Sequence, residues 1–210
     1  MKLTFDSAWQ IVGGLSAPSK MPCYGWSLSA KLCKTGGKLA QIEGSVCDKC
    51  YALRGNYLFP VVQNAMKKRL EGLNNSLFVS AMVLLIKSLD QKHFRWFDSG
   101  DLQNIKNLEK IAQIATQCPD VKFWLPTKEY GIVSSYIKAG NIIPDNLTIR
   151  LSGYMMEENG PITLAQRLGV GISEVRKEGY TCPSSNQGNK CETCRKCWDK
   201  SIFNIIYKRH

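Results

Sequence analysis

The chain has 210 residues, of which 44% are hydrophobic, and this composition excludes wholesale disorder and suits one globular domain. The formal net charge of +11 fits an acidic partner such as nucleic acid and, equally, a solvated basic surface. No apolar run approaches the roughly 20 residues of a membrane span, and the polar opening MKLTFDSAWQ differs from a secretory signal. We therefore expect a cytoplasmic protein that makes no membrane contact.

The predicted organisation is a single α/β domain over residues 1–210, in three segments. Residues 1–59 are rich in Gly, Pro and Cys, which break any periodicity, and are expected to form a Cys-rich cap. Residues 60–160 alternate between helix and strand patterns and are expected to form the βα core. Residues 180–210 carry a C-terminal cysteine cluster.

Apolar residues at helical spacing predict one helix over 60–73 and a second over 78–89. A strand-like FRWF at 94–97 follows. Asp101 is then expected to N-cap a third helix, because a short polar residue stands just before a new run of helical periodicity.

Strands and helices continue to alternate along the core segment. The runs VKFWL at 121–125 and NLTIRLSG at 146–153 are typical of strands, and a helix that stops at Gly140 lies between them. Alternating strands and helices indicate parallel βαβ units. The predicted fold is therefore a partial, TIM-barrel-like (β/α) barrel or an open parallel sheet, with Cys-rich metal-binding segments at both ends of the chain.

Polar residues stand at the carboxyl ends of all three predicted strands. In parallel α/β folds functional sites gather at this edge, so these residues are expected to share one face. They are Asp98, Ser99, Gly100 and Asp101; Thr127, Lys128 and Glu129; and Arg150, Ser152 and Gly153.

Nine cysteines in a reducing compartment are more typical of metal ligands or catalytic groups than of disulfides. Cys118 stands alone and is expected to be a small buried hydrophobe. The other eight are the predicted metal ligands and form two quartets: Cys23, Cys33, Cys47 and Cys50, then Cys182, Cys191, Cys194 and Cys197.

The C-terminal quartet has the more specific spacing. The run CETCRKC at 191–197, with Cys182 before Pro183 upstream, is typical of cubane 4Fe-4S sites. Zinc more often takes pairs of Cys-x2-Cys knuckles, but all-thiolate coordination suits both metals, so zinc stays an alternative. We expect one or two 4Fe-4S clusters.

Most aromatic residues of the predicted strands are expected in the core, because alternation in strands turns them inward. They are Trp96, Phe97, Phe123 and Trp124. Trp198 is expected to pack beside the C-terminal metal site and to limit the access of solvent.

Seven pieces of the chain, in this order, carry a family resemblance: MPCYGWSLSAKLC, SVCDKCYALRGNYLFPVVQNAMKKR, FRWFDSGDL, FWLPTK, NLTIRLSG, a Cys-Pro pair and CETCRKCWD. They resemble the bacteriophage family called gene product eighty-eight, over almost the whole chain. The resemblance implies a cysteine-rich metalloprotein that is made during infection and works in the host cytoplasm. It implies no particular reaction.

The motif CDKCYA before the first long helix and the turn SGD after the next strand are similar to those of radical S-adenosylmethionine enzymes, which are built on partial (β/α) barrels. The similarity implies that three cysteines hold a cubane cluster with one iron open to S-adenosylmethionine. The compact cysteine spacing of those enzymes is absent here. The residues implied are Cys33, Cys47 and Cys50 as ligands, Ser99, Gly100 and Asp101 as the cofactor turn, and Lys128 and Arg150 as substrate contacts.

A competing interpretation rests on residues 163–175, TLAQRLGVGISEV, which fit the helix-turn-helix template with Ala165, a turn at Gly169 and Val175 packing back. Two hypotheses therefore stand. The first is an iron–sulfur protein with redox or radical-type activity on a small-molecule substrate or a redox partner. The second is a zinc-stabilised nucleic-acid-binding regulator without enzymatic activity.

Overall fold

The computed structural model describes residues 2–209. Within that range a six-stranded sheet forms the centre of the molecule, and every strand pairs parallel to its neighbour in the order β1-β2-β3-β4-β5-β6. The strands are β1 (Gly25–Trp26), β2 (His93–Trp96), β3 (Lys122–Thr127), β4 (Leu147–Ser152), β5 (Gly171–Arg176) and β6 (Asn204–Lys208). The predicted parallel α/β sheet is confirmed.

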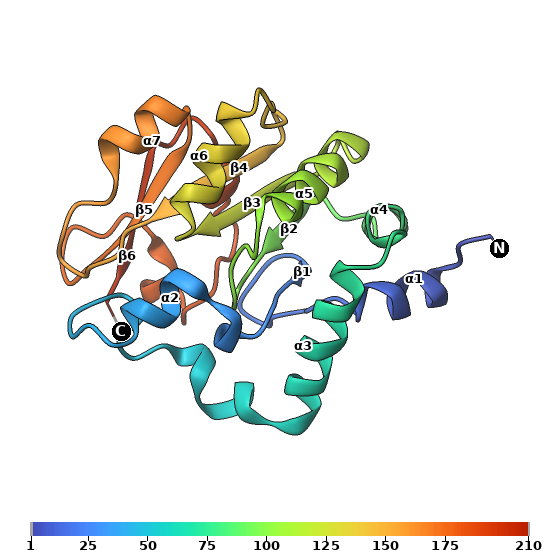
Figure 1. The fold of residues 1–210 in the computed structure, drawn as a ribbon. Coiled ribbons are helices and arrows are strands. Elements are labelled where there is room, and N and C mark those ends of the chain that lie inside the picture. The colour runs from blue at the N-terminus through green and yellow to red at the C-terminus, as the bar shows by residue number, and fades with distance from the viewer. Residues whose placement is uncertain (1, 210) are drawn as a thin grey trace.

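Helices connect the strands and cover the sheet (Figure 1). In Figure 1 the arrowheads of β2 and β3 point toward the blue and cyan segment that contains α2, so this segment lies at the carboxyl edge of the sheet. The α-helices of residues 2–209 are α1 (Phe5–Val12), α2 (Lys34–Leu39), α3 (Pro60–Leu73), α4 (Phe78–Ser88), α5 (Ile105–Gln117), α6 (Tyr130–Lys138) and α7 (Ile162–Leu168). Short 3-10 helices are η1 (Ala30–Leu32), η2 (Tyr51–Leu53), η3 (Gly55–Leu58), η4 (Pro183–Asn186) and η5 (Lys196–Trp198).

One face of the sheet is covered by helices. Register partners in a sheet project to the same side, so Phe94, Phe123 and Leu147 line this face together. They belong to the large hydrophobic core, which buried residues of α1, α4, α5, α6 and α7 complete.

The opposite face is covered by the cysteine-rich C-terminal segment. Arg95, Trp124 and Thr148 share this face in register, and Trp124 forms a second buried cluster with Cys197 and Trp198. Helices on one side and the C-terminal segment on the other therefore make three layers.

Sequence periodicity located the helices of the core segment. The first two predicted helices correspond to α3 and α4, and Gly140, at φ +82°, follows the end of α6 as expected. Pro60 occupies the first turn of α3, where a missing N–H costs nothing.

The prediction that Asp101 N-caps the third helix is wrong. α5 begins at Ile105, and the side chain of Asn104 caps it by accepting the N–H of Asn107 at 3.0 Å. Asp101 bonds instead to the end of β3, because tertiary partners there outcompete a local cap.

The helix-turn-helix prediction is also wrong. α7 ends at Leu168, and Gly169 stops it in the left-handed conformation at φ +64°. The expected recognition helix is strand β5, which pairs with both β4 and β6. Its β-branched residues Ile172 and Val175 suit a strand once two partner strands are in place.

Sequence analysis did not anticipate α1, β1 or β6. α1 has a complete capping box, in which Thr4 and Ser7 satisfy each other's backbone N–H, and it packs on α4. β1 has only two residues, too few for a visible pattern. Because β1, β5 and β6 lie outside residues 60–160, the sheet takes strands from all three segments of the chain.

The predicted core aromatics are buried, each with at most 5% of its surface exposed, and Cys118 is 2% exposed, as expected for a small hydrophobe. Within residues 2–209, no helix combines the length and the apolar character that crossing a membrane requires.

Candidate functional site

Three cysteines gather beyond the carboxyl ends of the first strands. Cys33 stands between η1 and α2, and Cys47 and Cys50 lie in the turn before η2. The three are close enough that Cys47 and Cys50 both raise the pKa of Cys33, and Cys50 raises that of Cys47. We call Cys33, Cys47 and Cys50 the N-terminal thiol site.

Gly36 keeps the space between two of these sulfur atoms open. A β-carbon at position 36 would lie 3.5 Å from Cys47 Sγ, 3.7 Å from Cys33 Sγ and 3.1 Å from Cys33 Cβ. Any side chain there would crowd both thiols, so the glycine leaves a small cradle between them.

Burial controls the ionisation of these thiols. It raises the pKa of Cys33 to about 12, with a further increase from the carboxylate of Asp101 and an opposing effect from the ammonium of Lys128. Burial also raises the pKa of Cys47, again opposed by Lys128. Both thiols are therefore protonated at neutral pH without a ligand, and metal binding would release their protons.

The predicted cofactor turn, Ser99 to Asp101, packs against the residues that follow β1. The N–H of Leu28 donates to the carbonyl of Ser99 at 3.2 Å, and the hydroxyl of Ser99 donates to the carbonyl of Leu28 at 2.8 Å. Gly100 has φ +74°, and a β-carbon there would lie 2.6 Å from the Leu28 carbonyl oxygen. Glycine is required because both the conformation and the close approach exclude a side chain.

Asp101 joins the ends of β2 and β3. The hydroxyl of Thr127 donates to Oδ1 at 2.6 Å, and the N–H of Lys128 donates to Oδ2 at 2.8 Å. Burial raises the pKa of Asp101, and these hydrogen bonds oppose the increase. The arrangement brings Lys128 and Asp101 beside the N-terminal thiol site.

Two further contacts fix the thiol-bearing loop to the sheet. The N–H and the hydroxyl of Thr35 donate to the two carboxylate oxygens of Glu129 at 2.9 and 3.0 Å. The N–H of Val46, next to Cys47, donates to the carbonyl of Tyr154 at 2.9 Å. The loop is therefore held at the ends of both β3 and β4.

Sequence analysis missed the tyrosines beside this site. The hydroxyl of Tyr57 donates to Oδ2 of Asp98 at 3.2 Å, and that of Tyr51 donates to the Asp98 carbonyl. The piece YALRGNY directly after Cys50 is the signal that could have found them. Phe97 precedes Asp98 with φ +51°, a strained conformation of the kind that concentrates at functional sites and that no sequence pattern shows.

The remaining metal-ligand candidates form a second group, which includes Cys23. Cys182 and Cys194 raise the pKa of Cys191, and Cys191 raises that of Cys23. Cys182 and Cys191 also raise the pKa of Cys197. We call Cys23, Cys182, Cys191, Cys194 and Cys197 the C-terminal thiol site.

Cys23 joins the C-terminal group because β1 separates it from the other N-terminal cysteines. It precedes the strand, whereas Cys33 follows it. The adjoining residues 20 and 21 contact Cys191, whose N–H donates to the carbonyl of Lys20 at 3.1 Å and whose sulfur lies 3.9 Å from Met21 Sδ. The predicted grouping of four and four is therefore three and five in space.

Burial also raises the pKa of three C-terminal thiols, Cys23, Cys191 and Cys197. Burial raises the pKa of Cys23 to about 12 against the charge of Arg95, and raises the pKa of Cys197 to about 11. Cys197 Sγ lies 3.3 Å from the hydroxyl of Tyr207, which together with Arg150 opposes the increase.

Trp198 packs beside Cys197. Its ring meets Trp124 edge-to-face at 5.3 Å and His93 at 5.4 Å, and its Nε1 donates to the carbonyl of Phe94 at 2.9 Å. Trp198 therefore lies beside one predicted ligand, and its role in limiting the access of solvent to a metal stays a prediction.

Arg95 lies between the two thiol sites. Its charge favours a lower pKa for Cys23 and Cys191 on one side and for Tyr51 on the other. The guanidinium lies 4.5 Å from the centre of the Trp124 ring, and its buried Nε has no hydrogen-bond partner among residues 2–209. A buried cation in this position favours negative charge at the sites around it.

Within the described part of the chain, no three or more His, Cys, Asp or Glu side chains converge closely enough to hold a single metal ion. The cysteines of each thiol site are neighbours, but they do not form a single-ion site in this structure.

A family model described as gene product 88 matches residues 2–200, a range that contains both thiol sites. The chain belongs to the gene product 88 family. The resemblance of the cysteine segments to that family is confirmed. No curated protein and no solved structure matches the chain, so the likeness to radical S-adenosylmethionine enzymes gains no support from a relative.

In this member of the gene product 88 family, Arg150 anchors the C-terminal segment to the sheet. It is fully buried, and its five N–H groups donate to five carbonyl groups of the C-terminal segment. The acceptors are Lys196, Cys197, Asp199, Ile202 and Phe203, at 2.7 to 3.3 Å. All five donors are used, so Arg150 fixes the C-terminal thiol site to β4 and has no N–H group free for a ligand.

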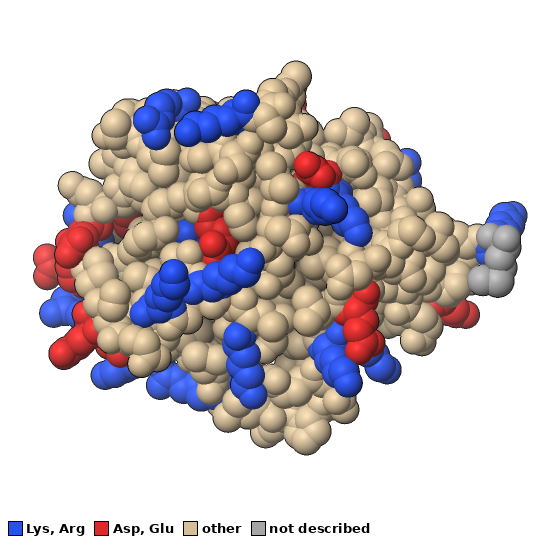
Figure 2. Space-filling view, in the orientation of Figure 1, with Lys and Arg blue, Asp and Glu red and all other residues tan. Residues whose placement is uncertain are grey.

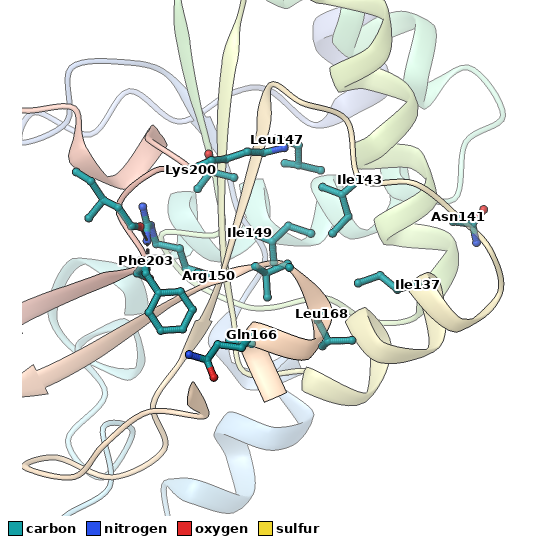
Figure 3. A pocket seen from close by; sticks show the side chains of 16 residues that line it. Ile137, Asn141, Ile143, Leu147, Ile149, Arg150, Gln166, Leu168, Lys200 and Phe203 are labelled. Carbon is teal, nitrogen blue, oxygen red and sulfur yellow. Dashed lines mark hydrogen bonds between the residues drawn. The ribbon is translucent and has the colours of Figure 1, made fainter. Parts of the chain in front are cut away.

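A cavity of about 460 Å³ lies at the opposite edge of the sheet. Figure 3 shows its wall of apolar side chains, including Ile137, Ile149 and Leu168. It is next to the amino ends of β4 and β5, whereas sites in parallel α/β folds form at the carboxyl ends. Neither thiol site opens into it.

Proposed function

We propose that the protein is an iron–sulfur enzyme of the radical type, with a cubane 4Fe-4S cluster at the N-terminal thiol site and S-adenosylmethionine as its cofactor. The observation that supports it is the gathering of three thiols from one loop beside the Ser99–Asp101 turn, at the carboxyl edge of a parallel sheet. Three thiolates leave one iron of a cubane without a protein ligand.

The donor set suits such a cluster. All three ligands are thiols, and within residues 2–209 no three His, Cys, Asp or Glu side chains converge on a single ion such as tetrahedral zinc. A cubane is larger than one ion and spans a wider gap. The cradle at Gly36 provides room between Cys33 and Cys47.

A cubane cluster with an open iron supplies a binding point and an electron for the reductive cleavage of S-adenosylmethionine. The chain's own residues position the cofactor. Lys128 carries a positive charge for its carboxylate, and Asp101 keeps one lone pair on Oδ2 for its amino group, since Lys128 N–H uses the other. Ser99 and Gly100 hold Asp101 in place through the turn.

The finer architecture that accompanies this function is a partial (β/α) barrel. Strand order follows chain order, and the buried residues of α1, α4, α5, α6 and α7 pack on one face, as in a barrel wall. The other face is then the interior, where Arg95 and the C-terminal thiol site lie. In this arrangement the C-terminal thiol site holds a second cluster that exchanges electrons with a redox partner.

The zinc-stabilised regulator has less to support it. Its expected recognition helix is strand β5, which is paired on both sides, so this segment cannot enter a DNA groove as a helix.

Anaerobic purification with iron and labile-sulfide analysis tests the proposal. We expect a brown protein with about eight iron atoms per chain when both sites hold 4Fe-4S clusters. Cys47→Ala and Cys194→Ala should each lose about half of this iron, and Cys118→Ala, which changes a buried thiol outside both sites, should lose none. A colourless protein with stoichiometric zinc would refute the proposal.

Binding of S-adenosylmethionine tests the cofactor separately. The reduced wild-type protein should bind it and show a changed electron paramagnetic resonance spectrum. Cys194→Ala should retain this response and Cys47→Ala should lose it. An iron-loaded protein whose spectrum S-adenosylmethionine leaves unchanged would reject radical chemistry and leave only a cluster protein.

A further inference from the structure

The positive charge of the chain is concentrated around the N-terminal thiol site. Residues 7–70 contain nine Lys and Arg but only two acidic residues, Glu43 and Asp48, so this segment carries a net +7 of the chain's +11. The stretch 49–70, which begins one residue before Cys50, has no acidic residue at all. A polyanion would therefore meet little repulsion along it.

Most basic side chains of this segment point into solvent, whereas Arg69 is buried and donates to the carbonyl of Gly14. Lys34 and Lys38 on α2, Arg54 before η3, and Lys67 and Lys68 on α3 are exposed. Figure 2 shows blue side chains over α2 and over the chain that leads into and along α3.

The same stretch exposes large apolar and aromatic side chains. Tyr51 has 57% of its surface exposed, Leu58 50%, Phe59 55% and Val61 73%. They follow Cys50 directly in η2, η3 and the first turn of α3. This ridge carries the two rings of Tyr51 and Phe59 among the cations Lys49, Arg54 and Lys67. Rings and cations together are the composition of a surface on which unpaired bases stack.

The ridge continues into a groove of about 520 Å³ between α1 and α3. Val61 belongs to both, and the other wall carries the indole of Trp9. The side chains of Gln10 and Asn64 offer amide donors and acceptors, and Lys68 stands at its border. Aromatic, amide and ammonium groups together match a nucleotide, in which every unit carries a ring, an edge with hydrogen-bonding groups and a phosphate, better than a chain of acidic residues such as polyglutamate, which has no rings to stack.

We propose that this surface binds a single-stranded nucleic acid, from the groove along Phe59 to the N-terminal thiol site, and that a nucleic acid is the substrate class of that site. The role as substrate rests on the proposed function. The binding itself does not.

Fluorescence anisotropy with labelled oligothymidylate and oligouridylate of about 16 nucleotides tests it. We expect at least one of the two oligonucleotides to bind the anaerobically purified full chain more tightly than duplex DNA of the same length. Affinity should fall with salt. Lys67→Ala/Lys68→Ala should reduce the slope of log affinity against log salt by about 1.4, because each lost phosphate contact removes about 0.7.

Phe59→Ala should weaken binding about tenfold, the cost of one lost stacking contact. Matched controls are Lys106→Ala/Lys138→Ala, which removes two exposed charges on α5 and α6, and Ile142→Ala, at a side chain that is 84% exposed. The control lysine pair should reduce the salt slope by less than Lys67→Ala/Lys68→Ala does. Ile142→Ala should weaken binding by less than Phe59→Ala does.

Equal slopes for the two lysine pairs would overturn the inference, as would tighter binding to phosphatidylserine vesicles or polyglutamate than to either oligonucleotide. Metal analysis of the same samples separates the two proposals. Oligonucleotide binding by a chain without iron would sustain the surface and refute the cluster, and the reverse result would refute only the surface.

Discussion

At the scale of single residues, Arg150 demonstrates how burial changes the role of a charge. In the sequence it stands among polar strand-end residues and resembles a substrate contact. In the structure all five of its N–H groups are used by carbonyls of residues 196–203. A segment without regular hydrogen-bond ladders thereby has its backbone satisfied inside the molecule.

Arg150→Met should lower the free energy of unfolding by about 3 kcal/mol or more, because it leaves several buried carbonyls without a donor. Urea denaturation of wild type and variant measures the loss. Arg167→Met removes an exposed arginine of α7 and should change stability by less than about 0.5 kcal/mol. Similar values for the two variants would contradict the clamping role.

At the scale of elements, the turn after β2 is set by its contact with the chain after β1. Gly100 combines a positive φ with a close approach to Leu28, and these two requirements can be separated by experiment. Gly140 has φ +82° but open space around its missing β-carbon.

Gly140→Ala should therefore lower the free energy of unfolding by about 1 kcal/mol, the cost of holding an alanine in the left-handed conformation. Gly100→Ala should cost that amount plus the displacement of Leu28, at least about 2 kcal/mol in total. Thermal unfolding of both variants gives the comparison. Equal shifts in Tm would mean that the turn tolerates a side chain against β1.

At the scale of the whole molecule, the two thiol sites draw on opposite ends of the chain. The C-terminal thiol site joins Cys23 to residues 182–197, so it connects the beginning and the end of the sequence across the sheet. Sequence spacing assigned Cys23 to the other quartet, because spacing along a chain cannot reveal that β1 passes between two neighbouring cysteines.

Cys23→Ser should therefore alter only the C-terminal centre. If both sites hold clusters, Cys23→Ser/Cys194→Ala should contain as much iron as Cys194→Ala alone, and the iron that both retain should depend on Cys47. Iron analysis and absorption spectra check this. Loss of the Cys47-dependent iron in Cys23→Ser would assign Cys23 to the N-terminal site after all.

The sequence by itself determined the elements whose patterns are long and local: α3, α4, the strands around Phe94, Phe123 and Ile149, and the parallel α/β class that follows from their alternation. It also identified the cysteines and the Ser99–Asp101 turn as candidates. It failed where pairing with distant strands decides the outcome, in β1, β5 and β6, and where a buried partner captures a side chain, as at Asp101 and Arg150.

Only the tertiary structure decided which cysteines are neighbours. Periodicity reports which side of an element is apolar, because that depends on residues a few positions apart. The meeting of Cys23 with Cys191 depends on where separate elements come to lie, since hydrogen bonds and burial across the sheet fix it and no spacing in the chain encodes it.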